Sequence, residues 1–134
     1  MTRSLQCVVV TPEQTLRDTR AQFVSVTLED GELGIAPAHS PLLGRLGCGE
    51  MRITTDGKVD HYFVEGGFVE VLHDVVSILT PRAIAAEDLD EFIVAAELER
   101  ARSQEANTPE LVKARNEAIT RGQAMLRVAR HSGI

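Results

Sequence analysis

The sequence predicts an α+β protein in two parts, an antiparallel β-sandwich over residues 1–84 and an antiparallel two-helix hairpin over residues 85–134. Up to about residue 80, short apolar runs alternate or are rich in β-branched residues, and turn residues separate them, as in antiparallel sandwiches. After Pro81 the apolar residues take up helical spacing, and acidic residues crowd the start of the new segment. Strands followed by helices indicate an α+β fold.

Six runs are expected to form strands: Leu5–Val10, Phe23–Leu28, Glu50–Thr54, Lys58–Val64, Phe68–Leu72 and Val75–Thr80. Thr55-Asp56-Gly57 is typical of a hairpin turn, because its last two residues accept a positive φ. His73-Asp74 marks a second tight turn between strands. Gly66-Gly67 predicts a bulge or a tight turn rather than a binding site.

The C-terminal part is expected to hold two helices that pack against each other. In the first helix, the buried face should consist of Leu89, Phe92, Ile93 and Ala96, which follow the i, i+3, i+4, i+7 rule. Thr108 is suited to cap the second helix, and Pro109 suits its first position. The seam of the second helix should consist of pairs that recur every seven residues, Leu111/Val112, Ala118/Ile119 and Met125/Leu126. Gly122 on this stripe allows a close approach of the two helices.

Composition excludes several classes of protein. The chain has 134 residues, 43% of them apolar and 25% charged, which is typical of a globular domain. Its net charge of −6 argues against a nucleic-acid partner. No apolar run approaches the ~20 residues of a membrane-spanning helix, and no export signal is visible at the start. Cys7 and Cys48 are therefore expected to be free thiols in a reducing compartment.

The stretch from Gly31 to Gly44 is the most distinctive part of the sequence, because glycines and prolines punctuate it. Its composition predicts a shaped surface loop. It does not match the GxxxxGK[ST] pattern of a phosphate-binding loop. His39 has no acid or cysteine at metal-ligand spacing, and the other histidines are scattered, so no metal site is predicted.

Four stretches of the sequence carry a resemblance to a known family. They are Gly31-Glu32-Leu33-Gly34-Ile35, Pro37-Ala38-His39-Ser40-Pro41-Leu42-Leu43, Gly66-Gly67-Phe68-Val69-Glu70-Val71 and Ala86-Glu87-Asp88-Leu89-Asp90. On these motifs the chain, from about Leu5 to its C-terminus, resembles the epsilon subunits of bacterial F-type ATP synthases, which correspond to the mitochondrial delta subunit. The resemblance implies a small β-sandwich followed by a two-helix domain, in agreement with the residue patterns.

The resemblance also implies a non-catalytic subunit without a cofactor, at the foot of the central stalk. Its expected partners are the gamma subunit and the c-ring, and it would lie on the cytoplasmic face of the bacterial cell membrane without inserting into it. Gly31, Glu32, Leu33 and Gly34 are then expected to face the c-ring, and Pro37, His39 and Pro41 to lie near gamma. On the residues alone, Glu32 can also be a solvated turn carboxylate, and His39 can fix its own loop by a hydrogen bond.

Many members of this family also inhibit ATP hydrolysis by extending the C-terminal helices into the catalytic head. Residues 85–105 carry seven acids and two bases, whereas residues 106–134 carry two acids and five bases. The resemblance implies that Arg115, Arg121 and Arg127 engage the alpha and beta subunits when the hairpin extends. The same arginines and Arg130 can also pair with the acidic first helix, at about 0.2–1 kcal/mol for each exposed pair.

Some members of the family bind ATP through an (Ile/Leu)-Asp-x-x-Arg-Ala motif at the start of the first helix. Here Asp90 is present, but Ile93 stands where the motif has its arginine. A triphosphate would lose a charge-assisted contact. ATP binding is therefore not expected, and Asp90 is interpreted as a partner of the helix dipole.

Two other classes of function compete with a stalk subunit. A small hydrolase using Glu50, Glu65 or Glu70 would need a nucleophile and a base, and the sequence offers no such pair. Glu65 and Glu70 lie an odd number of residues apart, so on a strand they would face opposite sides. The alternative to a stalk subunit is a stand-alone adaptor whose hairpin binds another helical partner.

Overall fold

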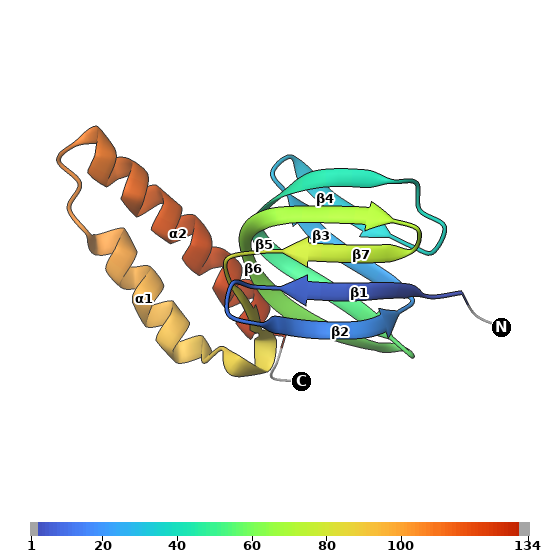
Figure 1. Ribbon diagram of the computed structural model, residues 1–134. Coiled ribbons are helices and arrows are strands. Elements are labelled where there is room, and N and C mark those ends of the chain that lie inside the picture. The colour runs from blue at the N-terminus through green and yellow to red at the C-terminus, as the bar shows by residue number, and fades with distance from the viewer. Residues whose placement is uncertain (1–2, 132–134) are drawn as a thin grey trace.

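The computed structural model describes residues 3–131 and has the two predicted parts, a β-sandwich and a helical hairpin that extends from one end of it (Figure 1). The strands are β1 (Leu5–Val10), β2 (Thr15–Ala21), β3 (Phe23–Leu28), β4 (Gly31–Ile35), β5 (Leu42–Thr55), β6 (Lys58–Leu72), β7 (Val75–Leu79) and β8 (Ala83–Ala85). The helical elements are a short 3-10 helix, η1 (Ala86–Asp88), and the α-helices α1 (Glu91–Ser103) and α2 (Pro109–Ala129). The predicted fold class is confirmed.

The strands form one hydrogen-bonded sheet in the order β2-β1-β7-β6-β5-β3-β4, with β8 paired to β6. Neighbouring strands are antiparallel except β1 and β7, which run parallel. The long strands β5 and β6 bend, so the sheet folds over on itself (Figure 1). The core between the two layers takes side chains from both, for example Val9, Val26, Met51 and Ile78.

Strand β6 is continuous from Lys58 to Leu72, although the sequence predicted two strands separated at Gly66-Gly67. The glycines mark a bend inside the strand, where its partner changes from β8 to β7. Gly67 has a φ of +107°, and a Cβ there would lie 2.0 Å from the carbonyl oxygen of Leu79. Only glycine fits this position.

Both predicted hairpin turns are confirmed. Asp56 and Gly57 have φ values of +50° and +81°, as a two-residue turn between twisted strands requires. His73 and Asp74, with φ of +50° and +61°, make the second turn. These turns set the register of β5 against β6 and of β6 against β7.

Three strands were not predicted: β2, β4 and β8. The Gly31–Gly44 stretch is not a single loop, because β4 and the first residues of β5 lie within it. Strands β2 and β4 stand at the two ends of the strand order and each pairs with one neighbour. An end strand buries less apolar surface than a central one, so its sequence shows little apolar alternation.

The helices begin at capping residues. The side chain of Asp90 accepts hydrogen bonds from the backbone N–H groups of Phe92 and Ile93, at 2.9 and 3.2 Å. The hydroxyl of Thr108 accepts one from the N–H of Leu111 at 3.1 Å, and Pro109 is the first residue of α2, as predicted. Asp90 thus satisfies donors that the first turn of a helix leaves unpaired.

The predicted buried face of the first helix is confirmed at Leu89, just before α1, and wrong at Phe92, Ile93 and Ala96, which are exposed. Phe92 and Ile93 are 87% and 58% exposed, and the residues of α1 that are buried are Val94 and Leu98. The face is rotated because Leu98 packs over Gly122 of α2, where a Cβ would lie 3.0 Å from the Leu98 side chain. The seam of α2 is buried near its C-terminal end, while Leu111 and Val112 at the other end are exposed.

One apolar cluster joins the hairpin to the sandwich. Its buried members are Phe63, Ala86, Leu89, Val94, Ala124, Met125, Val128 and Ala129. Phe63 comes from β6, η1 contributes Ala86, and the last turns of α2 contribute four residues. The hairpin therefore rests on the sandwich through the C-terminal end of α2, and its tip points away from the sheet (Figure 1).

Candidate functional surfaces

The residues predicted to face the c-ring form strand β4 at one edge of the sheet. Glu32 is exposed and lies 3.7 Å from Arg52 of β5, measured between Oε1 and Nη2. Leu33 packs against the core, and a Cβ on Gly34 would lie 2.6 Å from Cζ of Phe23. The strand thus presents a carboxylate and an edge backbone, with Leu33 and Gly34 fixed by packing.

The residues predicted to lie near gamma belong to the loop between β4 and β5. The N–H of Ala38, whose φ is +67°, donates to Asp74 Oδ1 at 2.7 Å, which ties this loop to the β6–β7 turn. Nδ1 of His39 lies 2.7 Å from the carbonyl oxygen of Ser40, a local hydrogen bond that helps fix the loop. Loop and turn lie at the end of the sandwich opposite the hairpin (Figure 1).

An apolar surface continues from this loop across the outer face of β5, β6 and β7. Its exposed members are Leu43, Phe68, Leu72, Val75 and Leu79. Phe68 pairs in register with Leu79, and Leu72 with Val75, so the side chains lie side by side on one face. This surface was not predicted, although β7 reads VVSIL, with apolar residues on both faces rather than in alternation.

We call the surface made by Leu43, Phe68, Leu72, Val75 and Leu79 the outer apolar face. Leu43 is 72% exposed and Phe68 is 47% exposed. The guanidinium of Arg45 lies 5.7 Å from the centroid of the Phe68 ring. Glu70 and Ser77 pair with each other on the same face, between the two apolar pairs, so the apolar side chains surround one polar pair. Exposed apolar side chains gathered on one face are typical of a surface that another protein covers.

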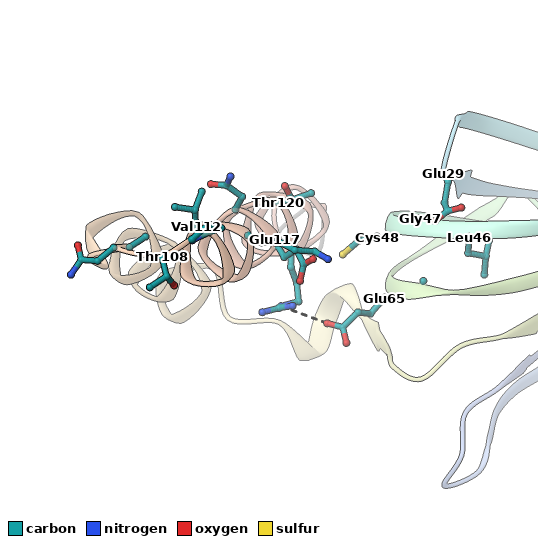
Figure 2. Close-up of a pocket in the computed structure, with 16 residues that line it drawn as sticks. Glu29, Leu46, Gly47, Cys48, Glu65, Thr108, Val112, Glu117 and Thr120 are labelled. Carbon is teal, nitrogen blue, oxygen red and sulfur yellow. Dashed lines mark ion pairs between the residues drawn. The ribbon is translucent and has the colours of Figure 1, made fainter.

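A cleft of about 990 Å³ separates α2 from the bend of β5 and β6. On the sandwich side its walls include Glu29, Cys48 and Glu65 (Figure 2). On the helix side they include Val112, Glu117 and Arg121 of α2. Arg121 Nε lies 3.6 Å from Glu65 Oε1, and this ion pair spans the base of the cleft. The first half of α2 therefore stands away from the sheet.

The basic side chains of α2 differ in their partners. Arg121 pairs with the sandwich, and Arg130, just after α2, pairs with Glu91 of α1 at 3.1 Å. Within residues 3–131, Arg115 and Arg127 make no ion pair. The pairing with the acidic first helix that the sequence allows is therefore observed for Arg130, and within residues 3–131 it is not observed for Arg115, Arg121 or Arg127.

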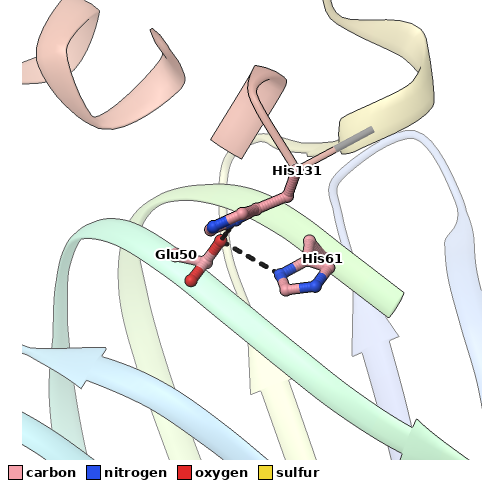
Figure 3. A group of neighbouring side chains, drawn as sticks. All are labelled: Glu50, His61 and His131. Atoms are coloured by element: carbon pink, nitrogen blue, oxygen red, sulfur yellow. Dashed lines mark hydrogen bonds and ion pairs between the residues drawn. The ribbon is translucent and has the colours of Figure 1, made fainter. Parts of the chain in front are cut away.

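A cluster of two histidines and a carboxylate lies where α2 ends on the sheet (Figure 3). Oε2 of Glu50, on β5, lies 3.1 Å from Nδ1 of His61 on β6 and also accepts a hydrogen bond from Nδ1 of His131, which follows α2. The imidazole centroids are 4.4 Å apart. Neither histidine was predicted to take part in a site, because the two lie far apart in the chain.

The environments of Cys7 and Cys48 disfavour the reactive thiolate form of both side chains. Both are free, as predicted. Burial raises the pKa of the Cys7 thiol to about 12, and burial followed by the nearby Glu65 carboxylate raises the pKa of Cys48. Because the thiolate is the reactive form, both thiols are poor nucleophiles at neutral pH.

Comparison with known proteins gives concordant similarities. A family model described as the β-sandwich domain of the ATP synthase delta/epsilon chain matches residues 4–86. The ATP synthase epsilon chain of Rhodopirellula baltica is 42% identical over 127 residues, which cover 95% of this chain and 99% of that one. The epsilon chain of Xylella fastidiosa is 39% identical, with 95% and 96% covered.

Among solved structures, a chain of the mitochondrial ATP synthase of Euglena gracilis superimposes with a TM-score of 0.86 and 23% identity. The alignment covers 96% of this chain and 82% of that one, which shows a shared fold. Within residues 3–131, no helix is long and apolar enough to cross a membrane.

Proposed function

Because this chain belongs to the ATP synthase delta/epsilon family and is a rotor-stalk subunit of an F-type ATP synthase, we propose that its sandwich joins the gamma subunit to the c-ring. The observation that carries the proposal is that the similarity to epsilon chains spans both the sandwich and the hairpin. The role is mechanical and non-catalytic, and the chain sits peripherally on the cytoplasmic face of the cell membrane.

Gamma is proposed to dock on the outer apolar face. This surface is continuous with the loop that holds Pro37, His39 and Pro41, so the motif and the exposed apolar side chains mark one region. Removing such side chains from water drives most protein association. The hydrogen bond from Ala38 to Asp74 supports this role, because it fixes the loop beside the face before a partner arrives.

The c-ring is proposed to contact strand β4. Glu32 offers an exposed carboxylate there, and among residues 3–131 no strand lies beside the outer edge of β4. Arg52, 3.7 Å from Glu32, orients the carboxylate on the surface. A charged group on an interface rim changes the rate and specificity of association more than its strength.

The hairpin is proposed to inhibit ATP hydrolysis by reaching the alpha and beta subunits. Arg115 and Arg127 support this, because their charges are not neutralised by ion pairs within residues 3–131. To extend, the hairpin must leave the Phe63 cluster and break the Arg121–Glu65 pair, whose exposed geometry makes it worth at most about 1 kcal/mol. ATP is not proposed as a ligand, because Asp90 is used as a helix cap and Ile93 is apolar.

Co-purification from cells tests the proposal. A tagged copy of the chain should elute with gamma and c subunits, and Leu43→Glu should lose gamma because it places a charge on the outer apolar face. Phe92→Glu, which also places a carboxylate at an exposed apolar position but on α1, should retain both partners. Elution of the unaltered chain without gamma would contradict the proposed role.

A further inference from the structure

We propose that Glu50, His61 and His131 form a zinc site that joins the end of α2 to the sandwich. This site is separate from the surfaces proposed for gamma and the c-ring, and its existence does not depend on the stalk function. The three residues come from β5, β6 and the end of the hairpin (Figure 3).

The donor set suits zinc. Two imidazole nitrogens and one carboxylate oxygen are ligands that zinc takes in protein sites with three protein ligands and a water. The carboxylate brings negative charge, and neutral imidazoles add none, so an ion with two positive charges is well matched. His131 is the most exposed of the three, which leaves a path for the ion and room for the water.

The distances are close to those of a tetrahedral site. Bonds of about 2.1 Å to zinc separate two ligand atoms by roughly 3.4 Å. Glu50 Oε2 and His61 Nδ1 are 3.1 Å apart, and one potential ligand atom from each residue lies within 4.8 Å of the others. Small side-chain rotations therefore bring the three atoms around one ion, with no change in the sheet.

The second oxygen of the carboxylate already has a partner. Arg52 Nε lies 3.8 Å from Glu50 Oε1, an ion pair that places the guanidinium beside one oxygen while the other faces the histidines. Groups that orient a ligand in this way are typical of metal sites. Arg52 also places a positive charge nearby, which lowers the affinity for a cation.

Zinc at this position would hold the hairpin against the sandwich. His131 lies beyond Ala129, the last residue of α2, whereas Glu50 and His61 belong to the sheet. Because the complete site exists only when the hairpin is docked, binding must favour the docked arrangement. At a zinc concentration one hundred times the Kd, the docked form gains about a hundredfold over forms that do not bind.

The test is a zinc titration of the purified chain in competition with a chromophoric chelator. One equivalent should bind to the unaltered chain. His61→Gln, His131→Gln and Glu50→Gln should each weaken binding by at least about tenfold, the lower end of the loss seen on removing even an outer-sphere partner. His73→Asn is the matched control, because it removes a histidine from the β6–β7 turn, at the end of the sandwich opposite the hairpin. Asparagine tolerates the φ of +50° at this position.

Circular dichroism identifies any variant that fails to fold, and NMR of the unaltered chain gives an independent result. Zinc should shift the imidazole signals of His61 and His131 and leave those of His39 and His73 in place. Equal zinc affinity in the three ligand variants and the control would overturn the proposal. Shifts confined to His39 or His73 would also overturn it, as would the absence of binding.

Discussion

Replacing Phe68 by alanine should weaken gamma binding about thirtyfold. The ring is 47% exposed in the free chain, and an aromatic side chain buries about 150–250 Å² when fully covered, so docking would remove about 100 Å² from water. At about 25 cal/mol per Å² this area contributes about 2.5 kcal/mol. The alanine methyl group retains part of the contact, which leaves a loss of about 2 kcal/mol, or about thirtyfold in Kd.

Calorimetry with purified gamma subunit measures this change. Phe92→Ala is the matched control, because that ring is 87% exposed but lies on α1, away from the outer apolar face. The Phe68 variant should remain folded, since the contact it loses with Arg45 is an exposed cation–π pair worth about 0.5–1 kcal/mol. A Kd within about twofold of the unaltered chain would refute docking of gamma on this face.

Four further results are expected. A fragment ending at Asp88 should unfold cooperatively in urea, because it keeps β8, although it uncovers Phe63; a gradual transition would contradict this. Arg115→Gln with Arg127→Gln should raise ATP hydrolysis by the assembled enzyme and change the free energy of unfolding by under about 0.5 kcal/mol; unchanged hydrolysis would exclude them as inhibitory groups. Calorimetry of the isolated chain with ATP should give no tight binding, because the motif arginine is absent, and a micromolar Kd would contradict that reasoning. Since burial raises the pKa of Cys7 to about 12, iodoacetamide should leave Cys7 unmodified at pH 8 until the chain is denatured; rapid modification of the native chain would show an open core.

The parts of the fold that depend on residues close together in the sequence could be predicted. Strands β1 and β3 have the predicted bounds, because each has the apolar pattern of a strand with a face in the core. The turn at Asp56-Gly57 and the cap at Thr108 follow from the conformations those residues accept. The bounds of β2 and β4 could not be predicted, because these strands are held by pairing at the ends of the sheet rather than by a local apolar pattern.

The functional surfaces divide in the same way. The family motifs singled out residues 31–34 and the stretch from Pro37 to Pro41 because those residues are contiguous in the sequence, but they did not predict that residues 31–35 form a strand. The face of α1 depends on contacts with Gly122, so the helical pattern alone placed Phe92 and Ile93 on the wrong side. The meeting of His61 and His131 at Glu50 depends on where α2 ends on the sheet, and no local signal encodes that position.

ATP-driven proton pumping in membrane vesicles tests the central claim most directly. Vesicles whose ATP synthase has been depleted of its own epsilon subunit should pump poorly, because gamma is not held firmly to the c-ring. Adding this chain should restore pumping, and adding the fragment that ends at Asp88 should restore it as well, since the sandwich carries both proposed contacts. Binding of the chain to the depleted enzyme without any recovery of pumping would contradict a role in joining gamma to the c-ring.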